Sequence, residues 1–197
     1  VIAIENLSAC KPSEYFPYPK QVGVLKMVFV SRISPKKNLL FLLELLEYFQ
    51  NEKITLDIYG PKEDAEYWKK CQSKMDNLKG VAYRGVLQHD ELQSTLKSYH
   101  LFVLPTLNEN FGHIILEALN SSLPILLSDN TPWLKLEEKE IGYSISLSQK
   151  KEWVNTLQAI TGMNEKEYSI LRQKAWSFGQ EKLKQEDLLK EYIQLFS

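Results

Sequence analysis

Two glutamates stand at a chemically suggestive interval in the apolar segment of residues 104–124. Glu109 precedes a Phe-Gly pair, and Glu117 follows after seven intervening residues, inside the run HIILEAL. A partly buried carboxylate needs hydrogen-bond donors, and because it only accepts, the hydroxyl groups of a diol would suit it. One such glutamate alone is more often structural, since the helix dipole favours an acid in the N-terminal half of a helix. Two of them around one loop favour ligand binding.

The loop TLNENFGH, which contains Glu109, presents backbone amides at the expected start of a helix. Gly112 allows the main chain to approach a ligand closely. The N–H groups of Asn110, Phe111, Gly112 and His113 would face an anion or a sugar hydroxyl, because the first amides of a helix have no partner within it. We therefore expect this loop to contact the same ligand as the two carboxylates.

A second charged loop lies earlier in the chain, where Arg32 follows an apolar run and Lys37 falls in the first turn of the next predicted helix, beside Lys36. The macrodipole disfavours cations at a helix N-terminus, so a bound anion would explain their presence. A diphosphate would suit the fork of an arginine and the charge of a lysine. From the spacing alone, solvated surface charge is an equally good explanation.

The order of apolar runs and amphipathic segments predicts an α/β fold: a Rossmann-like, doubly wound parallel sheet with helices on both faces. Short apolar runs predict strands at residues 26–31, 54–60, 81–85, 101–105, 124–129 and 142–147. Helical patterns occupy residues 34–50, 64–78, 89–99, the stretch after TLNENFGH, 151–160, and segments from about 165 and about 180. Ligands bind outside the carboxyl ends of such strands, where both charged loops lie.

Two helix starts carry recognisable capping signals. Ser34 is a predicted N-cap with Pro35 at the first helical position, and Asp90 and Gln93 stand at the spacing of a capping box. Residues 1–25 differ from the rest, because they contain three prolines and several aromatic residues, and they read as an irregular connector.

The composition fits one globular α/β domain and excludes several other classes of protein. The 197 residues are 44% hydrophobic and 25% charged with a net charge of −1, so no global basic field would hold nucleic acid. The apolar runs are shorter than the roughly 20 residues that span a bilayer. Two isolated cysteines, three histidines and the lack of an Asp-x-Asp pair give no metal-binding pattern. We expect a metal-independent, cytoplasmic protein without a cofactor.

Five segments, in register from about residue 26 to about residue 147, resemble those of retaining glycosyltransferases of the GT-B fold, the large group-1 type. NENFGHIILEAL is similar to the E-x7-E motif of that family, and a strand with a proline follows it. VSRISPKKN resembles the phosphate loop, and LDIYGP resembles a strand and turn of the family pattern. VAYRGVLQHDELQSTLKSYHLFVLPT, between LDIYGP and NENFGHIILEAL, resembles the corresponding stretch of the family pattern. The E-x7-E motif alone is a weak pattern, whereas the ordered set is specific.

The resemblance implies a catalytic role for three residues. Arg32 and Lys37 would bind the diphosphate of a nucleotide-sugar donor and stabilise it as the leaving group. Glu109 would contact the donor sugar near its reacting face. We do not expect Glu109 to act as a covalent nucleophile.

The resemblance assigns the remaining contacts to donor binding. Glu117 would accept hydrogen bonds from the ribose hydroxyls, while residues 110–113 would offer amides to the sugar and the phosphates. The base would lie against the turn after VAYRG, around Arg84 and Val86, where the match is loosest.

Three departures from the family pattern are expected to change the site locally. Ser31 and Ser122 stand where glycines are usual, so we expect a phosphate loop slightly farther out and a different turn after the helix. DNTPW, at residues 129–133, replaces a glycine-rich loop and removes its amides. Trp133 would either pack against the fold, the more frequent role of such a residue, or stack on a sugar face.

We interpret the chain as the donor-binding C-terminal half of such an enzyme. Residues 1–25 would form an interdomain connector, 26–179 the nucleotide-sugar-binding domain, and 180–197 a helix that packs toward a missing N-terminal domain. The sequence begins without Met, and we expect this fragment alone to bind nucleotide weakly and to be inactive.

The full-length enzyme would transfer a sugar from a nucleotide-sugar donor to a glycan or glycolipid acceptor with retention of configuration. We expect the nucleotide to be UDP by default. The acceptor would bind through the missing domain, in polysaccharide or glycolipid biosynthesis, with peripheral association at the inner membrane surface. Two alternatives stay open. One is a non-catalytic nucleotide-sugar-binding domain, and the other is a GT-B relative such as a phosphorylase, a sugar phosphatase or a sugar-nucleotide epimerase.

Overall fold

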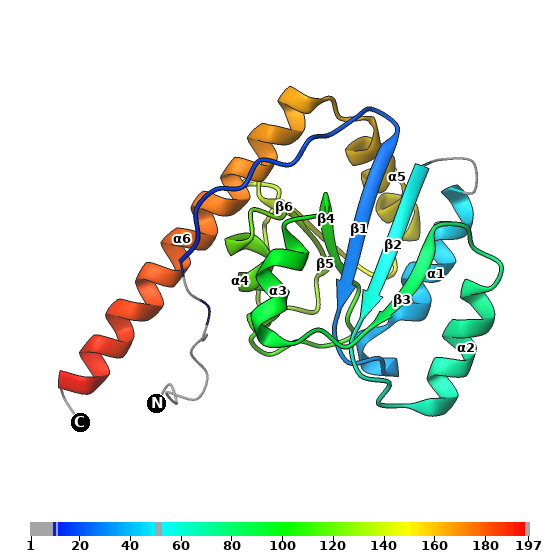
Figure 1. Cartoon of the computed structure of the whole chain (residues 1–197), viewed down its shortest axis with the longest axis horizontal. Helices are drawn as coiled ribbons and strands as arrows, with labels where there is room; N and C mark the ends of the chain where they lie inside the picture. The colour runs from blue at the N-terminus through cyan, green and yellow to red at the C-terminus, as the bar shows by residue number, and fades with distance from the viewer. Residues whose placement is uncertain (1–9, 11, 50–52, 196–197) are drawn as a thin grey trace.

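A computed structural model describes residues 10, 12–49 and 53–195 of the chain (Figure 1). Its centre is one parallel sheet of six strands in the order β3-β2-β1-β4-β5-β6. The predicted doubly wound sheet is therefore confirmed. The strands are β1 (Val24–Val30), β2 (Lys53–Tyr59), β3 (Val81–Gly85), β4 (Leu101–Leu104), β5 (Ile125–Ser128) and β6 (Gly142–Ile145).

Helices cover both faces of this sheet, as right-handed crossovers between parallel strands require. The helical elements are η2 (Pro35–Lys37), α1 (Leu39–Leu46), η3 (Glu47–Phe49), α2 (Ala65–Met75), α3 (His89–Leu96), α4 (His113–Asn120), α5 (Lys150–Gly162) and α6 (Glu165–Leu195). Figure 1 shows α1, α2 and α5 on one side of the sheet and α3, α4 and α6 on the other.

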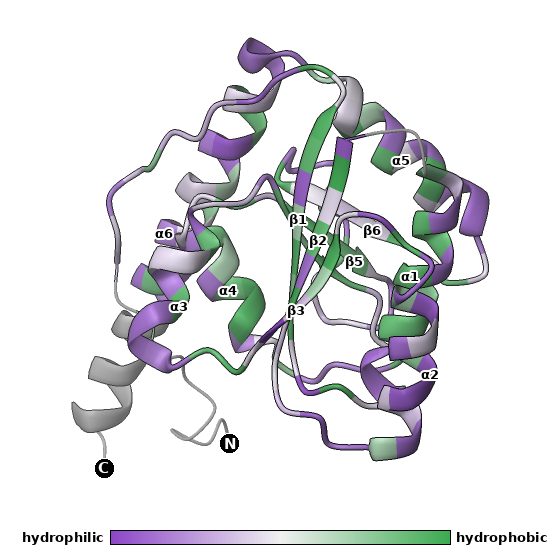
Figure 2. Ribbon diagram, turned by 45° about the vertical axis from the view of Figure 1, so that its right-hand side comes forward, coloured by the Kyte–Doolittle hydropathy of each residue, from purple (hydrophilic) through white to green (hydrophobic). Residues whose placement is uncertain are grey.

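The core lies between the sheet and these two helix layers. β4 and β5 read LFVL and ILLS and are buried at every position, because both faces of the inner strands are covered. Figure 2 shows the same arrangement as hydrophobic colour along the strands and hydrophilic colour on the outer helix surfaces. Such a core fixes where each strand ends, and so fixes the edge from which the charged loops emerge.

The predicted helix at residues 34–50 is interrupted near its start. Asn38 adopts a left-handed conformation with a φ of 56°, which separates the short 3-10 turn η2 from α1. Asparagine tolerates this conformation better than most residues. Pro35 does open η2, but Ser34 makes no side-chain cap bond. Lys37 therefore closes a separate turn and does not lie in the first turn of α1.

Two other helix predictions need correction. The capping box of α3 pairs Gln88 with Glu91, and the predicted pair of Asp90 and Gln93 is wrong by two residues. The two terminal helices are one continuous helix, α6. Gly179 lies at the predicted boundary, and a Cβ there would come within 2.9 Å of backbone atoms of α4. That glycine allows α6 to pack closely on α4, and it does not end the helix.

The turn after α4 keeps the left-handed geometry usual for glycine, although Ser122 occupies it with a φ of 61°. The N–H of Leu123 donates to the carbonyl oxygen of Ala118 at 3.0 Å, a bond of the type that closes helices at such a residue. The Ser122 hydroxyl oxygen accepts a hydrogen bond from the backbone N–H of Phe16 at 3.1 Å. The serine thus adopts the strained conformation and uses its side chain to attach the preceding segment.

That segment, residues 12–23, is irregular and follows α6 in Figure 1. The Trp176 indole N–H donates to the Ser13 carbonyl oxygen at 3.0 Å, and the Arg172 Nε donates to the Phe16 carbonyl oxygen at 2.9 Å. β1 begins at Val24, two residues before the predicted boundary. Residues 1–9 and 11 of the predicted connector lie outside the described residues, and the proposed division into domains stays a prediction.

Candidate functional site

A pocket of about 330 Å³ opens at the carboxyl ends of β1, β2 and β3. It is lined by Val30, Ser31, Arg32, Gly60, Pro61, Val86, Leu87, Gln88, His89, Leu92 and Ile114. Two predicted donor-binding residues, Arg32 and Val86, thus share one pocket with the first turn of α4. Its volume and its mostly apolar lining are typical of small-molecule sites.

The floor of this pocket depends on a glycine. Gly60 has a φ of 136°, and a Cβ there would lie 1.9 Å from the carbonyl oxygen of Ser31. Its N–H donates to the carbonyl oxygen of Gly85 at 2.8 Å, so the three strand ends are held together at this point. Any larger residue would push the turn after β2 away from the turn after β1.

Lys37 and Glu109 form an ion pair on the same edge of the sheet. The Lys37 Nζ lies 2.6 Å from the Glu109 Oε2, and the two side chains are only 8% and 18% exposed. Burial would raise the pKa of Glu109, but the hydrogen bond and charge of Lys37, helped by the amides of Asn110 and Phe111, outweigh it and lower that pKa below its usual value. Glu109 is therefore ionised and firmly held at neutral pH.

The amides of the predicted donor loop divide into two groups. The Asn110 N–H donates to the Glu109 Oε1 at 3.1 Å, and the Phe111 N–H also bonds to that carboxylate. The N–H groups of Gly112 and His113 have no acceptor among the described residues. Gly112 is the N-cap of α4, with a φ of 70°. Two of the four predicted amides are therefore available to a ligand at this helix N-terminus.

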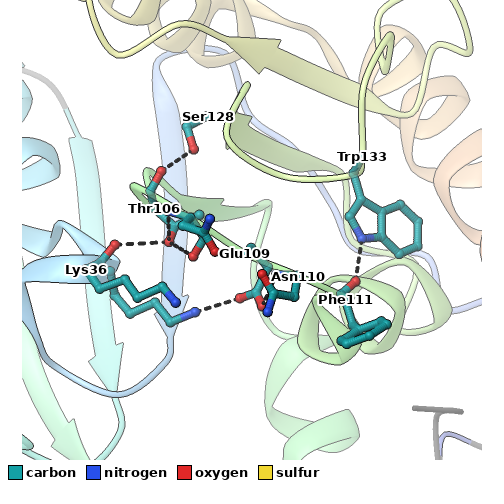
Figure 3. A network of polar contacts seen from close by, with 9 residues as sticks. Lys36, Thr106, Glu109, Asn110, Phe111, Ser128 and Trp133 are labelled. Atoms are coloured by element: carbon teal, nitrogen blue, oxygen red, sulfur yellow. Dashed lines mark hydrogen bonds and ion pairs between the residues drawn. The ribbon is translucent and has the colours of Figure 1, made fainter. Parts of the chain in front are cut away.

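Polar contacts connect the loops after β1, β4 and β5, as Figure 3 shows. The Thr106 hydroxyl lies within hydrogen-bond distance of two carbonyl oxygens, those of Lys36 at 3.1 Å and Asn108 at 2.9 Å. The Ser128 hydroxyl donates to the Thr106 carbonyl oxygen at 2.5 Å. The Glu109 N–H donates to the Asn130 carbonyl oxygen at 3.0 Å. This network holds Glu109 in place from the loops on either side.

Glu117 lies one turn beyond Ile114 on α4 and is half-buried. Burial raises its pKa, while the nearby charges of His89 and His113 lower it by less. No described residue donates a hydrogen bond to its carboxylate. Its position between the pocket residue His89 and the α4 N-terminus places a carboxylate with no donor among the described residues next to the pocket.

The two predicted arginines differ in position. Arg32 lines the pocket and pairs with Glu63 at 2.7 Å, with 57% of its side chain exposed, so a ligand anion could displace Glu63 easily. Arg84 pairs with Asp57 at 2.8 Å and does not line the pocket. Its exposed side chain is attached to β2, and a role in binding the base stays a prediction.

Trp133 packs against the fold, the first of the two roles considered for it. Its ring lies 6.5 Å from that of Phe178 on α6, and its indole N–H donates to the Phe111 carbonyl oxygen at 2.9 Å. Phe111 itself is half-exposed and stacks on His113 at a ring distance of 6.2 Å. Trp133 therefore contacts the donor loop through the N–H at the edge of its indole ring.

Among the pocket residues that the sequence reasoning missed, two carry polar side chains, Gln88 and His89. Their position directly after the third strand and its turn was the available signal, because every loop at the carboxyl edge is a candidate. It also missed Glu63, Thr106 and Ser128, whose contacts join segments far apart in the chain. Among the described residues, no group of three or more metal-ligating side chains is present, and no helix is long and apolar enough to cross a membrane.

Residues 12–175 match the family described as glycosyl transferases group 1. The sulfoquinovosyl transferase SQD2 of Arabidopsis thaliana is 32% identical over 101 residues, which cover 51% of this chain and 18% of that protein. A TarM mutant of S. aureus, solved with Fondaparinux, alpha-GlcNAc-glycerol and UDP, superposes with a TM-score of 0.71 at 20% identity, covering 94% of this chain and 38% of that one.

Anabaena HepE in complex with UDP-glucose superposes with a TM-score of 0.72 at 16% identity, covering 86% of this chain and 49% of that one. These likenesses show that the sheet and its helices have the fold found in GT-B glycosyltransferases. The chain spans less than half the length of each of these relatives. With most of its length matched by the family pattern, the chain belongs to the group 1 glycosyl transferases.

Proposed function

We propose that this chain binds the nucleotide-sugar donor of a glycosyltransferase that transfers the sugar to an acceptor hydroxyl with retention of configuration. The observation that carries the proposal is that several candidate binding groups lie together at one edge of the sheet. The pocket, the free amides of Gly112 and His113 and the Lys37–Glu109 pair lie at the carboxyl ends of the strands, and the half-buried Glu117 carboxylate lies beside them on α4. This edge is where doubly wound sheets bind nucleotides.

The chemistry of the edge suits the successive parts of such a donor. The apolar pocket around Val86 would hold the base, and Glu117 would accept hydrogen bonds from the ribose diol. The diphosphate would meet Arg32, Lys37 and the α4 N-terminus. We favour UDP as the nucleotide because the similar TarM and HepE structures contain UDP and UDP-glucose.

Glu109 would act on the sugar as a fixed, ionised hydrogen-bond acceptor. Its lowered pKa and its bonds to Lys37 and two amides stabilise the carboxylate and reduce its nucleophilicity. When the sugar departs, negative charge grows on the diphosphate, and Arg32, Lys37 and the free amides are placed to stabilise it. This account needs no metal ion, and metal independence is part of the proposal.

A thermal-shift screen tests donor binding directly. We would measure unfolding of the chain with UDP, GDP and ADP and their sugar conjugates. A ligand at 100 times its Kd stabilises the folded state by about 2.7 kcal/mol, which corresponds to a shift of roughly 5–10 °C for a chain of this size. Glu117→Gln should reduce the shift to about half or less, because binding weakened at least 10-fold leaves at most about 1.4 kcal/mol of stabilisation. The matched change Glu152→Gln, at an exposed position on α5, should preserve it.

Two results would contradict the proposal. The first is that no member of the panel shifts the wild-type chain. The second is that Glu117→Gln shifts as much as the wild type. Hydrolysis or epimerisation of a bound donor without an acceptor would instead favour the alternative enzyme classes.

A further inference from the structure

Two hydrogen bonds attach the loop after β5 to the proposed donor loop. The Glu109 N–H donates to the Asn130 carbonyl oxygen at 3.0 Å. The Trp133 indole N–H donates to the Phe111 carbonyl oxygen at 2.9 Å, the bond drawn in Figure 3. The first bond involves only backbone atoms, so many residues could make it. The second depends on the side chain of Trp133.

Trp133 is itself held from three sides. Its backbone N–H donates to the buried Thr131 hydroxyl oxygen at 3.2 Å, and its ring and that of Phe178 on α6 form a T-shaped pair. Its Nε1 would lie only 3.2 Å from a Cβ added at Gly112. The indole therefore occupies a defined place directly beside the Phe111–Gly112 peptide bond.

The planarity of that peptide bond transmits the contact. The Phe111 carbonyl and the Gly112 N–H belong to one trans peptide unit, so they point in opposite directions. When Trp133 binds the carbonyl from one side, the Gly112 N–H is directed to the other. That N–H has no acceptor among the described residues, and it belongs to the N-cap of α4.

The orientation of the Phe111–Gly112 peptide needs to be fixed, because a glycine at this position would otherwise allow two orientations. Gly112 stands at a φ of 70°, and glycine adopts both signs of φ at little energetic difference. The peptide before it could rotate so that its N–H and carbonyl exchange sides. A hydrogen bond to the carbonyl selects one of the two orientations.

We propose that Trp133 is a positioning residue that orients the Gly112 N–H toward the sugar-phosphate part of the donor. This inference rests on the proposed function. It assigns to the tryptophan of DNTPW a task that needs no direct contact with the ligand. It also links α6, through Phe178 and Trp133, to the geometry of the donor loop.

The test compares two identical substitutions. Trp133→Phe removes the bond to Phe111, and Trp176→Phe removes an indole bond of 3.0 Å to the Ser13 carbonyl oxygen, on α6 outside the donor loop. In the free chain, hydrogen exchange of the amides at residues 109–113 should accelerate in Trp133→Phe and stay at the wild-type rate in Trp176→Phe. Equal exchange in Trp133→Phe and the wild type would overturn the proposal.

Binding gives a readout that a packing role alone would not change. UDP-glucose and uridine are titrated into each variant. We expect Trp133→Phe to weaken UDP-glucose roughly 5- to 10-fold, the effect of losing one oriented hydrogen bond, and to leave uridine unchanged. An equal loss for both ligands, or no loss for either, would refute positioning. If the wild-type chain binds neither ligand, the proposed function fails, and the exchange rates alone decide on the role of Trp133.

Discussion

Glu109 and Glu117 lie in one segment but have opposite electrostatic surroundings. The pKa of Glu109 is lowered by Lys37 and two amides despite burial, whereas burial raises the pKa of Glu117, which has no hydrogen-bond donor among the described residues. A carboxylate that is already satisfied can act as a fixed charge, and one that is unsatisfied gains most from a ligand that donates. This contrast supports the proposed roles, in which Glu117 would bind the ribose and Glu109 the sugar.

The Lys37–Glu109 pair predicts a measurable coupling at the residue scale. Lys37→Met should lower the free energy of unfolding by about 2–4 kcal/mol, because it leaves a mostly buried carboxylate without its cation. The double variant Lys37→Met/Glu109→Gln should recover much of that loss. Denaturant unfolding of the wild type and the three variants gives the coupling energy, and additive losses would show that the pair contributes nothing.

The same pair predicts how stability depends on pH. The folded pKa of Glu109 lies below its ordinary value of 4.5, so its contribution is fully present above that value and is lost as pH falls through the folded pKa. Denaturant unfolding between pH 6 and 3, as a rough working range, should therefore show a smaller acid-induced loss for Glu109→Gln than for the wild type. Identical pH profiles would contradict the lowered pKa.

At this scale the sequence identified residues better than it identified their contacts. Arg32, Glu109 and Glu117 were singled out by type and spacing, and they lie at or next to the expected edge, while their roles in binding stay predictions. Their partners were not foreseen, because Lys37 and Glu109 are 72 positions apart and meet only through the fold. Arg84 is a second example. Its strand was predicted correctly, but its ion pair with Asp57 was not, because that partner lies on the neighbouring strand.

Turns between elements decide whether the edge can assemble. Gly60 joins the ends of β1, β2 and β3, and Asn38 separates the lysine-bearing turn η2 from α1. Apolar runs predicted every strand to within about two residues, since burial of both faces leaves a clear pattern. The break at Asn38 and the continuity of α6 through Gly179 were missed, because a left-handed residue and a close helix contact leave no periodic signal.

A matched pair of glycine substitutions tests this element-scale claim. Gly60→Ala should lower the free energy of unfolding by about 2 kcal/mol or more, because its Cβ would lie 1.9 Å from the Ser31 carbonyl oxygen at a φ that alanine avoids. Gly162→Ala, where a Cβ meets open space in α5, should change it by less than about 1 kcal/mol in the stabilising direction. Denaturant unfolding measures both. Equal effects would remove the special role of Gly60.

For the whole molecule, α6 and residues 12–23 form a strap across one helix layer. Arg172 is only 1% exposed and donates to the carbonyl oxygens of Phe16, Lys97 and Tyr99 at 2.9–3.0 Å. Lys97 is the C-cap of α3, where a cation is favoured by the helix dipole. The Arg172 side chain thus connects α6 to residues 12–23 and to the C-terminal end of α3. The helix layer beside α4 depends on these contacts.

Arg172→Met should lower the free energy of unfolding by about 3 kcal/mol, because one buried and two partly buried carbonyl oxygens lose their donor. Arg84→Met, which removes an exposed ion pair, should lower it by less than about 1 kcal/mol. Limited proteolysis should also cut within residues 12–23 faster in Arg172→Met. Equal proteolysis and stability of the two variants would argue against the strap.

The central claim, that Glu117 binds the ribose of a nucleotide-sugar donor, is tested most directly by crossing a ligand change with a residue change. The best nucleoside diphosphate from the thermal screen and its 2′,3′-dideoxy analogue are titrated calorimetrically into the wild type and Glu117→Gln. The wild type should prefer the ribose form by roughly 10- to 150-fold, the value of hydrogen bonds to a charged group. Glu117→Gln should lose that preference while remaining as stable as the wild type or more so, since it removes a half-buried charge whose folded pKa is raised. An undiminished preference in Glu117→Gln, or equal binding of both ligands by the wild type, would contradict the account.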